Sequence, residues 1–157
     1  MRTFRLYFVF LFAALLGCEP DDICIEGVAG TPELVVVFYD KNNPNTPKNV
    51  ANLQVKGMDN ETLLYNATND SIALPLKTGA SMSSFSIKKI ENEVEHEALL
   101  EINYTTNDQF ISRACGFKTT FEIATISDTK TNSWIQGIEI ITNSISDTKQ
   151  SHVKILH

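Results

Sequence analysis

The sequence predicts an all-β fold, an antiparallel sandwich of immunoglobulin-like or related type. Three observations lead to this prediction. Apolar and polar residues alternate with a period of two, turn-forming residues separate the alternating segments, and no segment combines helical periodicity with caps at both ends. Such alternation is typical of half-buried antiparallel strands, and short strands at this spacing favour a sandwich. A small β-barrel is the alternative arrangement.

The first half of the chain contains several short apolar runs. Val35, Val36 and Val37 make both faces of the run at residues 33–40 apolar, so we expect a central strand there. The Asn- and Pro-rich residues 40–49 then predict a loop. Further strands are expected over residues 50–56, 62–66, 71–76 and 84–90.

The second half of the chain shows the clearest alternation. Three runs place alternate side chains on one face of a strand, and they extend from Ala98 to Tyr104, from Phe117 to Ile123 and from Trp134 to Ile140. A last strand is expected over residues 152–156. Residues 106–108, Thr-Asn-Asp, are turn formers, so we expect a turn between the first two of these strands.

Residues 1–17 have the features of a signal peptide. Arg2 and Arg5 precede an uninterrupted apolar run from Leu6 to Leu16. This run is too short to cross a bilayer core of about 30 Å, which needs roughly 20 helical residues. Its length does fit the apolar core of a signal peptide.

The signal region ends in LLGC, Leu15 to Cys18, which resembles the lipobox of bacterial lipoproteins. The resemblance implies cleavage before Cys18 and a diacylglycerol on its thiol. We therefore expect a permanent membrane anchor, since more than one acyl chain gives stable attachment. A cleaved, soluble exported protein is the alternative, although no A-x-A-like cleavage site is present.

Residues 18–30 are expected to form a tether that carries the first cysteine after the anchor. Pro20 favours an extended chain, and Glu19, Asp21 and Asp22 keep it solvated. Such an acidic cluster resembles the surface-export signal of lipoproteins from the Bacteroidota. The resemblance implies display on the cell surface, and the periplasmic face of the outer membrane is the alternative location.

The mature chain is expected to be acidic and to contain one folded domain, residues 31–157. Removal of residues 1–17 leaves 140 residues, a length that suits a single domain. The full chain has 13 Lys and Arg against 19 Asp and Glu, and two arginines leave with the signal, so the mature charge is −8. Such a chain is a poor nucleic-acid binder, because phosphate contacts need Lys and Arg.

The cysteine content predicts one disulfide. The chain has three cysteines, so acylation of Cys18 leaves Cys24 and Cys115. Export brings this pair into an oxidising compartment, where paired cysteines tend to be cross-linked. Two free thiols are one alternative. A metal or redox role is another, although neither cysteine belongs to a C-x-x-C pair.

The acidic segments do not predict a metal centre. Residues 40–45 begin like a calcium loop, but Asn45 and Ala51 stand where an EF-hand needs glycine and glutamate. Glutamates recur at positions 91, 93, 95 and 97, and they would share one face if a strand extended backward from Ala98. A solvated outer face or a loop is expected, with weak divalent-cation binding as the alternative. We predict no cofactor.

No catalytic residue is predicted. The histidines are His96, His152 and His157, and their spacing matches no metal-binding motif. The chain lacks both a G-x-S-x-G elbow and a glycine-rich phosphate loop. An envelope hydrolase with an unrecognised active site is the alternative to a binding or structural role.

Two internal features carry further resemblances. FYD at residues 38–40, a cysteine soon after the lipobox, and ISRACGFK at residues 111–118 together resemble a family of uncharacterised Bacteroidota lipoproteins. That family has no assigned activity, so the resemblance implies no catalytic residue. Residues 70–72, Asp-Ser-Ile, resemble the acceptor for O-glycosylation in that phylum, which implies a sugar on Ser71.

The sequence as a whole therefore predicts a lipid-anchored envelope protein with a binding or structural role. The expected partner, besides the membrane, is another envelope protein or a glycan. An accessory lipoprotein that folds stably only within a complex is a further possibility.

Overall fold

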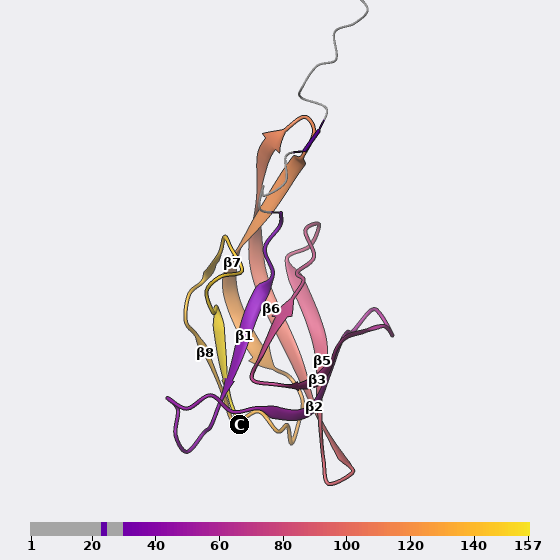
Figure 1. Ribbon diagram of the computed structural model, residues 1–157, viewed down its shortest axis with the longest axis vertical. Helices are drawn as coiled ribbons and strands as arrows, with labels where there is room; N and C mark the ends of the chain where they lie inside the picture. Colours follow the sequence, from indigo (N-terminus) through magenta and orange to yellow (C-terminus); the bar gives the residue numbers. More distant parts are fainter. Residues whose placement is uncertain (1–22, 25–29) are drawn as a thin grey trace, which may run out of the picture. The chain divides into compact units, whose positions relative to one another are not determined.

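The computed structural model describes residues 23–24 and 30–157, and Figure 1 shows its strands. It confirms the predicted all-β sandwich. Two sheets pack against each other around one hydrophobic core. The described residues form no helix and no closed barrel, so the barrel alternative is wrong.

Ten strands make up the described chain. They are β1 (Leu34–Tyr39), β2 (Val50–Gly57), β3 (Leu63–Asn69), β4 (Ser71–Leu74), β5 (Met82–Glu91), β6 (Val94–Ser112), β7 (Gly116–Asp128), β8 (Gly137–Ile140), β9 (Ser144–Ile145) and β10 (Val153–Leu156).

The strands form one four-stranded and one six-stranded sheet. The first has the order β4-β1-β10-β8, and the second has the order β3-β2-β5-β6-β7-β9. β1 pairs in parallel with β10, while β4 and β8 run antiparallel to their neighbours. β1 lies between β4 and β10, which confirms the central position predicted from its valines.

The core follows the predicted period of two. Alternate residues of β1 and β6 are buried, namely Leu34, Val36 and Phe38 on β1 and Ala98, Leu100, Ile102 and Tyr104 on β6. Burial of each large apolar side chain contributes roughly 1.5–3 kcal/mol. The alternation therefore stabilises the packing of the two sheets and fixes the register of each strand, because a one-residue slip would expose the whole set.

The turn predicted at residues 106–108 does not exist, because β6 continues to Ser112. The polar side chains there bond to β7. Thr119 Oγ1 donates to Asp108 Oδ1 at 2.6 Å, and Thr120 Oγ1 donates to the Asn107 carbonyl at 3.2 Å. These turn-forming residues therefore connect two long neighbouring strands.

The strand predicted from Trp134 is shorter than expected, because β8 begins at Gly137. Trp134 lies before the strand and donates its indole N–H to the Ile87 carbonyl at 3.1 Å. Its ring also packs on Phe38, with centroids 6.1 Å apart. Trp134 thus connects the two sheets.

The chain divides into two compact units. The smaller comprises the N-terminal residues through Val28 together with Phe110–Phe117, and of these the structure describes Ile23, Cys24 and Phe110–Phe117. The larger comprises the rest of the chain and contains the two-sheet core.

One buried polar network lies in the larger unit. Ser83 and Tyr104 are 1% and 2% exposed, and their hydroxyl oxygens are 2.7 Å apart. The Tyr104 hydroxyl donates to the Lys77 carbonyl at 2.9 Å, and the Lys77 backbone N–H donates to Ser83 Oγ at 3.1 Å. The network satisfies polar groups that would otherwise be costly to bury.

We predict that Tyr104→Phe destabilises the fold by about 1–3 kcal/mol, because the Lys77 carbonyl loses its donor while the ring remains packed. Urea unfolding followed by circular dichroism measures this change. Tyr39→Phe is the matched control, since its ring beneath Lys154 is kept and its hydroxyl makes no hydrogen bond within the described residues. We expect the control to change the free energy of unfolding by less than about 0.5 kcal/mol. Equal effects of the two substitutions would contradict the role of the network.

Candidate functional site

The two cysteines that remain after Cys18 are bonded to each other. The Sγ atoms of Cys24 and Cys115 lie 1.98 Å apart, and their Cα atoms are separated by 4.8 Å. The bond closes a loop with a sequence separation of 91 residues. Cys18 lies outside the described residues, so its predicted acylation stays a prediction.

Cys115 lies in the turn that joins β6 to β7. We call this turn and the strand residues next to it, Phe110–Phe117, the hairpin tip. The Cys115 backbone N–H donates to Ser112 Oγ at 3.0 Å. Gly116 has a φ of 70°, a conformation that glycine adopts without strain. The phenyl rings of Phe110 and Phe117 form an edge-to-face pair with centroids 5.4 Å apart. They are 60% and 68% exposed.

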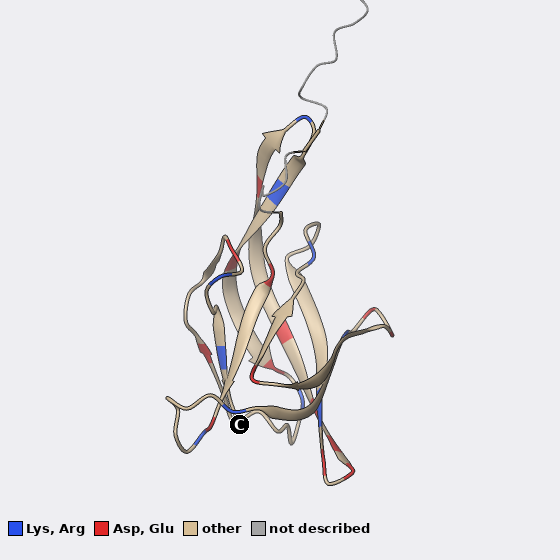
Figure 2. Cartoon of the chain, viewed as in Figure 1, with Lys and Arg blue, Asp and Glu red and all other residues tan. Residues whose placement is uncertain are grey.

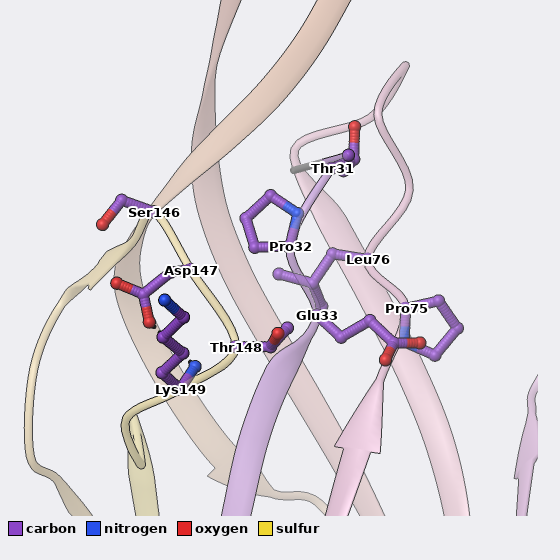
Figure 3. A pocket seen from close by; sticks show the side chains of 10 residues that line it. Thr31, Pro32, Glu33, Pro75, Leu76, Ser146, Asp147, Thr148 and Lys149 are labelled. Carbon is purple, nitrogen blue, oxygen red and sulfur yellow. Dashed lines mark hydrogen bonds between the residues drawn. The ribbon is translucent and has the colours of Figure 1, made fainter. Parts of the chain in front are cut away.

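A cleft of about 460 Å³ opens on the larger unit, and Figure 3 shows its lining. Residues 146–149 lie on one side, and residues 30–33 with Pro75 and Leu76 lie on the other. The charged residues of the lining are Glu33, Asp147 and Lys149, and none of the lining residues is aromatic. Pockets for small organic ligands are usually apolar and aromatic, so this cleft is a poor match for such a ligand.

His152 is the histidine that lies closest in sequence to residues 146–149 of the cleft lining, and it is fully buried. Its Nδ1 accepts a hydrogen bond from the Val35 backbone N–H at 2.9 Å, and its own backbone N–H donates to the Val35 carbonyl at 2.9 Å. Nδ1 is therefore an unprotonated acceptor, and the ring proton is on Nε2. Nε2 has no hydrogen-bond partner of good geometry in the described chain.

Burial lowers the pKa of His152, and the nearby Asp147 carboxylate and carbonyl offset only part of this effect. In a Ser-His-Asp triad the carboxylate orients the imidazole through Nδ1. Here the Val35 N–H occupies Nδ1. His152 is therefore a structural residue that connects β10 to β1, and it is not placed to serve as the base of such a triad.

The acidic residues at 91–97 lie around the turn of the β5–β6 hairpin and not along one strand, and Glu91, Glu93 and Glu95 are exposed, in agreement with a solvated segment or loop. β5 ends at Glu91 and β6 begins at Val94. Asn92 and Glu93 between them have φ values of 51° and 65°, which form the turn. Positive φ values of this kind occur mostly in turns, and Asn adopts them more readily than most residues. The four glutamates are therefore divided between β5, the turn and β6.

Lysines neutralise most of these carboxylates. The pairs are Lys89–Glu91 at 3.1 Å, Lys88–Glu95 at 3.1 Å and Lys130–Glu97 at 2.7 Å. The hydrogen bond from Lys130 holds the pKa of Glu97 below its ordinary value, with help from the Ser86 hydroxyl. Among the described residues, no cluster of three or more His, Cys, Asp or Glu side chains could hold a metal ion.

The calcium-like segment is an ordinary loop. Asp40 Oδ1 accepts the Asn42 backbone N–H at 2.7 Å, and Lys48 lies 3.5 Å from the other carboxylate oxygen. The Asn42 N–H lowers the pKa of Asp40 more than Lys48 does. The Asp40 carboxylate therefore stabilises the turn and forms an ion pair with Lys48.

Ser71, the predicted sugar acceptor, is the first residue of the edge strand β4 and is partly buried. Its neighbours Ile72 and Leu74 face the core, so Ser71 lies on the outer face of the sheet. Glycosylation at this position stays a prediction.

Edge strand β3 has an unusual composition. The terminal strands β4, β8 and β9 contain four, four and two residues, whereas β3 contains seven. Its sequence, LLYNATN, has neither a charged residue nor a proline, the residues that commonly protect sheet edges. Leu63 and Leu64 are 44% and 43% exposed, and Leu64 lines a shallow hollow with Met58.

Charged residues are spread over the described strands and loops, as the colouring in Figure 2 shows. Several lysines are paired with acids on the surface, for example Lys56 with Glu61, Lys77 with Asp59 and Lys154 with Glu139. Exposed pairs of this kind contribute little to stability, typically below about 1 kcal/mol each. They leave β3 as an uncharged stretch within a charged surface.

Sequence reasoning missed both exposed apolar features, the hairpin tip and the β3 edge. The alternation that it used predicts which face of a strand is buried, but not where a strand leaves the core or ends a sheet. A signal for the tip was present, because Phe110 and Phe117 flank a cysteine in a segment without acidic residues. The uncharged run at residues 63–69 was a weaker signal for an open edge.

Comparison with known proteins identifies a family. The model described as "Family of unknown function (DUF6452)" matches residues 52–157. This match covers more than half of the chain, so the chain belongs to the DUF6452 family. No curated protein and no solved structure matches it. Within the described residues, no helix is long and apolar enough to cross a membrane.

We predict that the fold loses stability as the pH falls from 7 to 5. Burial lowers the folded-state pKa of His152 and of His157 below the unfolded value of about 6.5. The unfolded chain therefore binds protons first. The stabilisation is complete above the unfolded pKa. As the pH falls below it, each histidine lowers the free energy of unfolding by up to about 1.4 kcal/mol per pH unit. The decrease ends once the histidine is protonated in the folded state too.

Urea unfolding at several pH values measures this dependence. His152→Asn keeps an acceptor for the Val35 N–H but cannot titrate. We therefore expect the free energy of unfolding of this variant to depend less steeply on pH, with the contribution of His157 remaining. His96→Asn removes an exposed imidazole and should retain the parent's slope. Identical slopes for the parent and His152→Asn would show that His152 does not titrate as described.

Proposed function

We propose that this member of the DUF6452 family is an exported lipoprotein, held in the cell envelope by lipid on Cys18, and that its β-sandwich binds another envelope protein. The observation that carries the proposal is the bond between Cys24 and Cys115. Structural disulfides persist in oxidising compartments and are rare in the cytosol. The bond therefore supports export, and it leaves Cys18 as the cysteine available for acylation.

The lipobox-like sequence LLGC, Leu15 to Cys18, supports the same location independently of the disulfide. Together with the acidic tether, it favours the outer membrane, on its periplasmic face or on the cell surface. A fatty-acylated N-terminus would keep the domain at the membrane without any membrane-spanning segment.

The β3 edge supports a protein partner. An exposed edge strand presents unpaired backbone N–H and C=O groups, to which an extended segment of another protein can add as a further strand. Among the described residues, only β2 pairs with β3. Leu63 and Leu64 project from opposite faces of the strand, so an added strand could be contacted on both faces. We propose that an extended, apolar segment of an envelope protein binds at this edge.

A glycan is the weaker candidate for the partner. The cleft at residues 30–33 and 146–149 offers hydroxyl and charged groups but no aromatic side chain. Small ligands are usually held by apolar and aromatic walls with a few polar groups. We therefore place the binding role at the β3 edge.

Cys18→Ala is predicted to abolish incorporation of labelled fatty acid in a bacterial host that processes lipoproteins, because no thiol remains at the mature N-terminus. Autoradiography of the immunoprecipitated protein measures this incorporation. Cys24→Ala is the matched control and should retain the label, because Cys24 belongs to the disulfide. Equal labelling of the parent and Cys18→Ala would refute the anchor.

Leu64→Lys is predicted to reduce recovery of the partner at least about tenfold, since a charge at the edge costs 1.4 kcal/mol or more of binding free energy. Quantitative mass spectrometry after affinity purification from native membranes measures recovery. Val94→Lys is the control, because Val94 is 52% exposed at the start of β6, away from β3 in the order of the sheet. Equal recovery with the two variants would rule out the β3 edge as the binding surface.

A further inference from the structure

The hairpin tip has an apolar surface that the proposed binding role does not use. Phe110 and Phe117 are 60% and 68% exposed, and Ile111 is 37% exposed. In the same unit, Ile23 precedes the bonded Cys24 and is 78% exposed. The rings of Phe110 and Phe117 touch each other and form one exposed apolar patch, and such patches mark sites of contact with another protein or with a membrane.

The hairpin tip itself has a composition compatible with a membrane, although the tether bonded to it through Cys24 is acidic. Phe110–Phe117 contains no acidic residue, and Arg113 is its one charged residue, although the mature chain has a net charge of −8. Phenylalanine side chains insert readily at the boundary between headgroups and acyl chains, and arginine is compatible with the headgroup layer. A carboxylate at this position would oppose such insertion.

The length of the tether limits how far the tip can lie from the anchor. Cys24 follows Cys18 by six residues, which span at most about 22 Å when fully extended. Cys24 is then bonded to Cys115, whose Cα lies 4.8 Å from its own. The headgroup layer is itself roughly 5–8 Å thick. The Cα of Cys115 therefore lies no more than about 27 Å from that of Cys18, so the tip stays within reach of the headgroup layer.

We propose that the hairpin tip docks in the headgroup region of the bilayer that holds the anchor, with Phe110, Ile111 and Phe117 in contact with lipid. The inference rests on the proposed acylation of Cys18, because the lipid chains bring the tip to the membrane. A tether this short gives an effective concentration in the millimolar range, so a weak interfacial affinity is enough. The tip would then be a second attachment point that restricts rotation about the anchor.

Depth-dependent fluorescence quenching tests the docking. The full-length lipidated protein is reconstituted in phosphatidylcholine vesicles with or without bromine on the acyl chains. The zwitterionic lipid avoids repulsion of the acidic tether. Phe117→Trp is the reporter, and Phe110→Trp is a second reporter in case the first variant does not fold. The native Trp134 is only 7% exposed and provides a constant background, which the parent protein measures.

We expect bromine to reduce the reporter emission at least about twofold, as for an indole inserted at the interface. Met58→Trp is the matched control, because Met58 is 51% exposed and lies in the larger unit. Its emission should not change with bromine. Circular dichroism confirms that each variant retains the β fold.

The possible failures are distinguishable. Acylated, vesicle-bound protein whose tip reporters are quenched no more than Met58→Trp would overturn the docking and leave the anchor intact. A blue shift of the tip reporters without quenching would also overturn it, since the tip would then be buried against another protein copy. Absence of acyl chains on Cys18, seen by intact-mass measurement, would overturn both the anchor and the docking.

Discussion

The bond between Cys24 and Cys115 is the constraint on which the rest of the account depends. It joins a residue only six positions after Cys18 to the turn between β6 and β7. The bond uses both cysteines that lipidation would leave, and it supports an oxidising compartment for the chain. It also keeps the exposed rings of the hairpin tip near the proposed anchor. Without it, the anchor and the hairpin tip would be unrelated features of the sequence.

The sandwich itself depends on a simpler constraint, the alternation of buried and exposed residues along each strand. Two faces of such residues form the core, and side chains such as Trp134 and His152 add hydrogen bonds between its strands. The Trp134 indole N–H and His152 Nδ1 have partners and therefore structural roles. The two features on which the proposals rest lie elsewhere, in the uncharged edge strand β3 and in the apolar hairpin tip.

Most of the fold could be predicted from the sequence, because period-two alternation directly reports a half-buried strand. The central position of β1 followed from its three consecutive valines, and the disulfide followed from cysteine number and compartment. The error at residues 106–108 has a clear cause. There, polar residues were interpreted from their local turn preference, whereas their hydrogen bonds to side chains of β7 keep them in a strand. Strand order is set by long-range pairing, so neither the β3 edge nor the exposure of Phe110 could be read from local patterns.

Peptide mapping of the protein isolated from membranes of its native host, without reduction, tests the central claim most directly. Mass spectrometry of the digest identifies each cysteine in its native chemical state. The account predicts a cross-linked peptide containing Cys24 and Cys115, together with an N-terminal peptide that begins at an acylated Cys18. Free thiols at Cys24 and Cys115, or an unmodified Cys18 still continuous with residues 1–17, would contradict it.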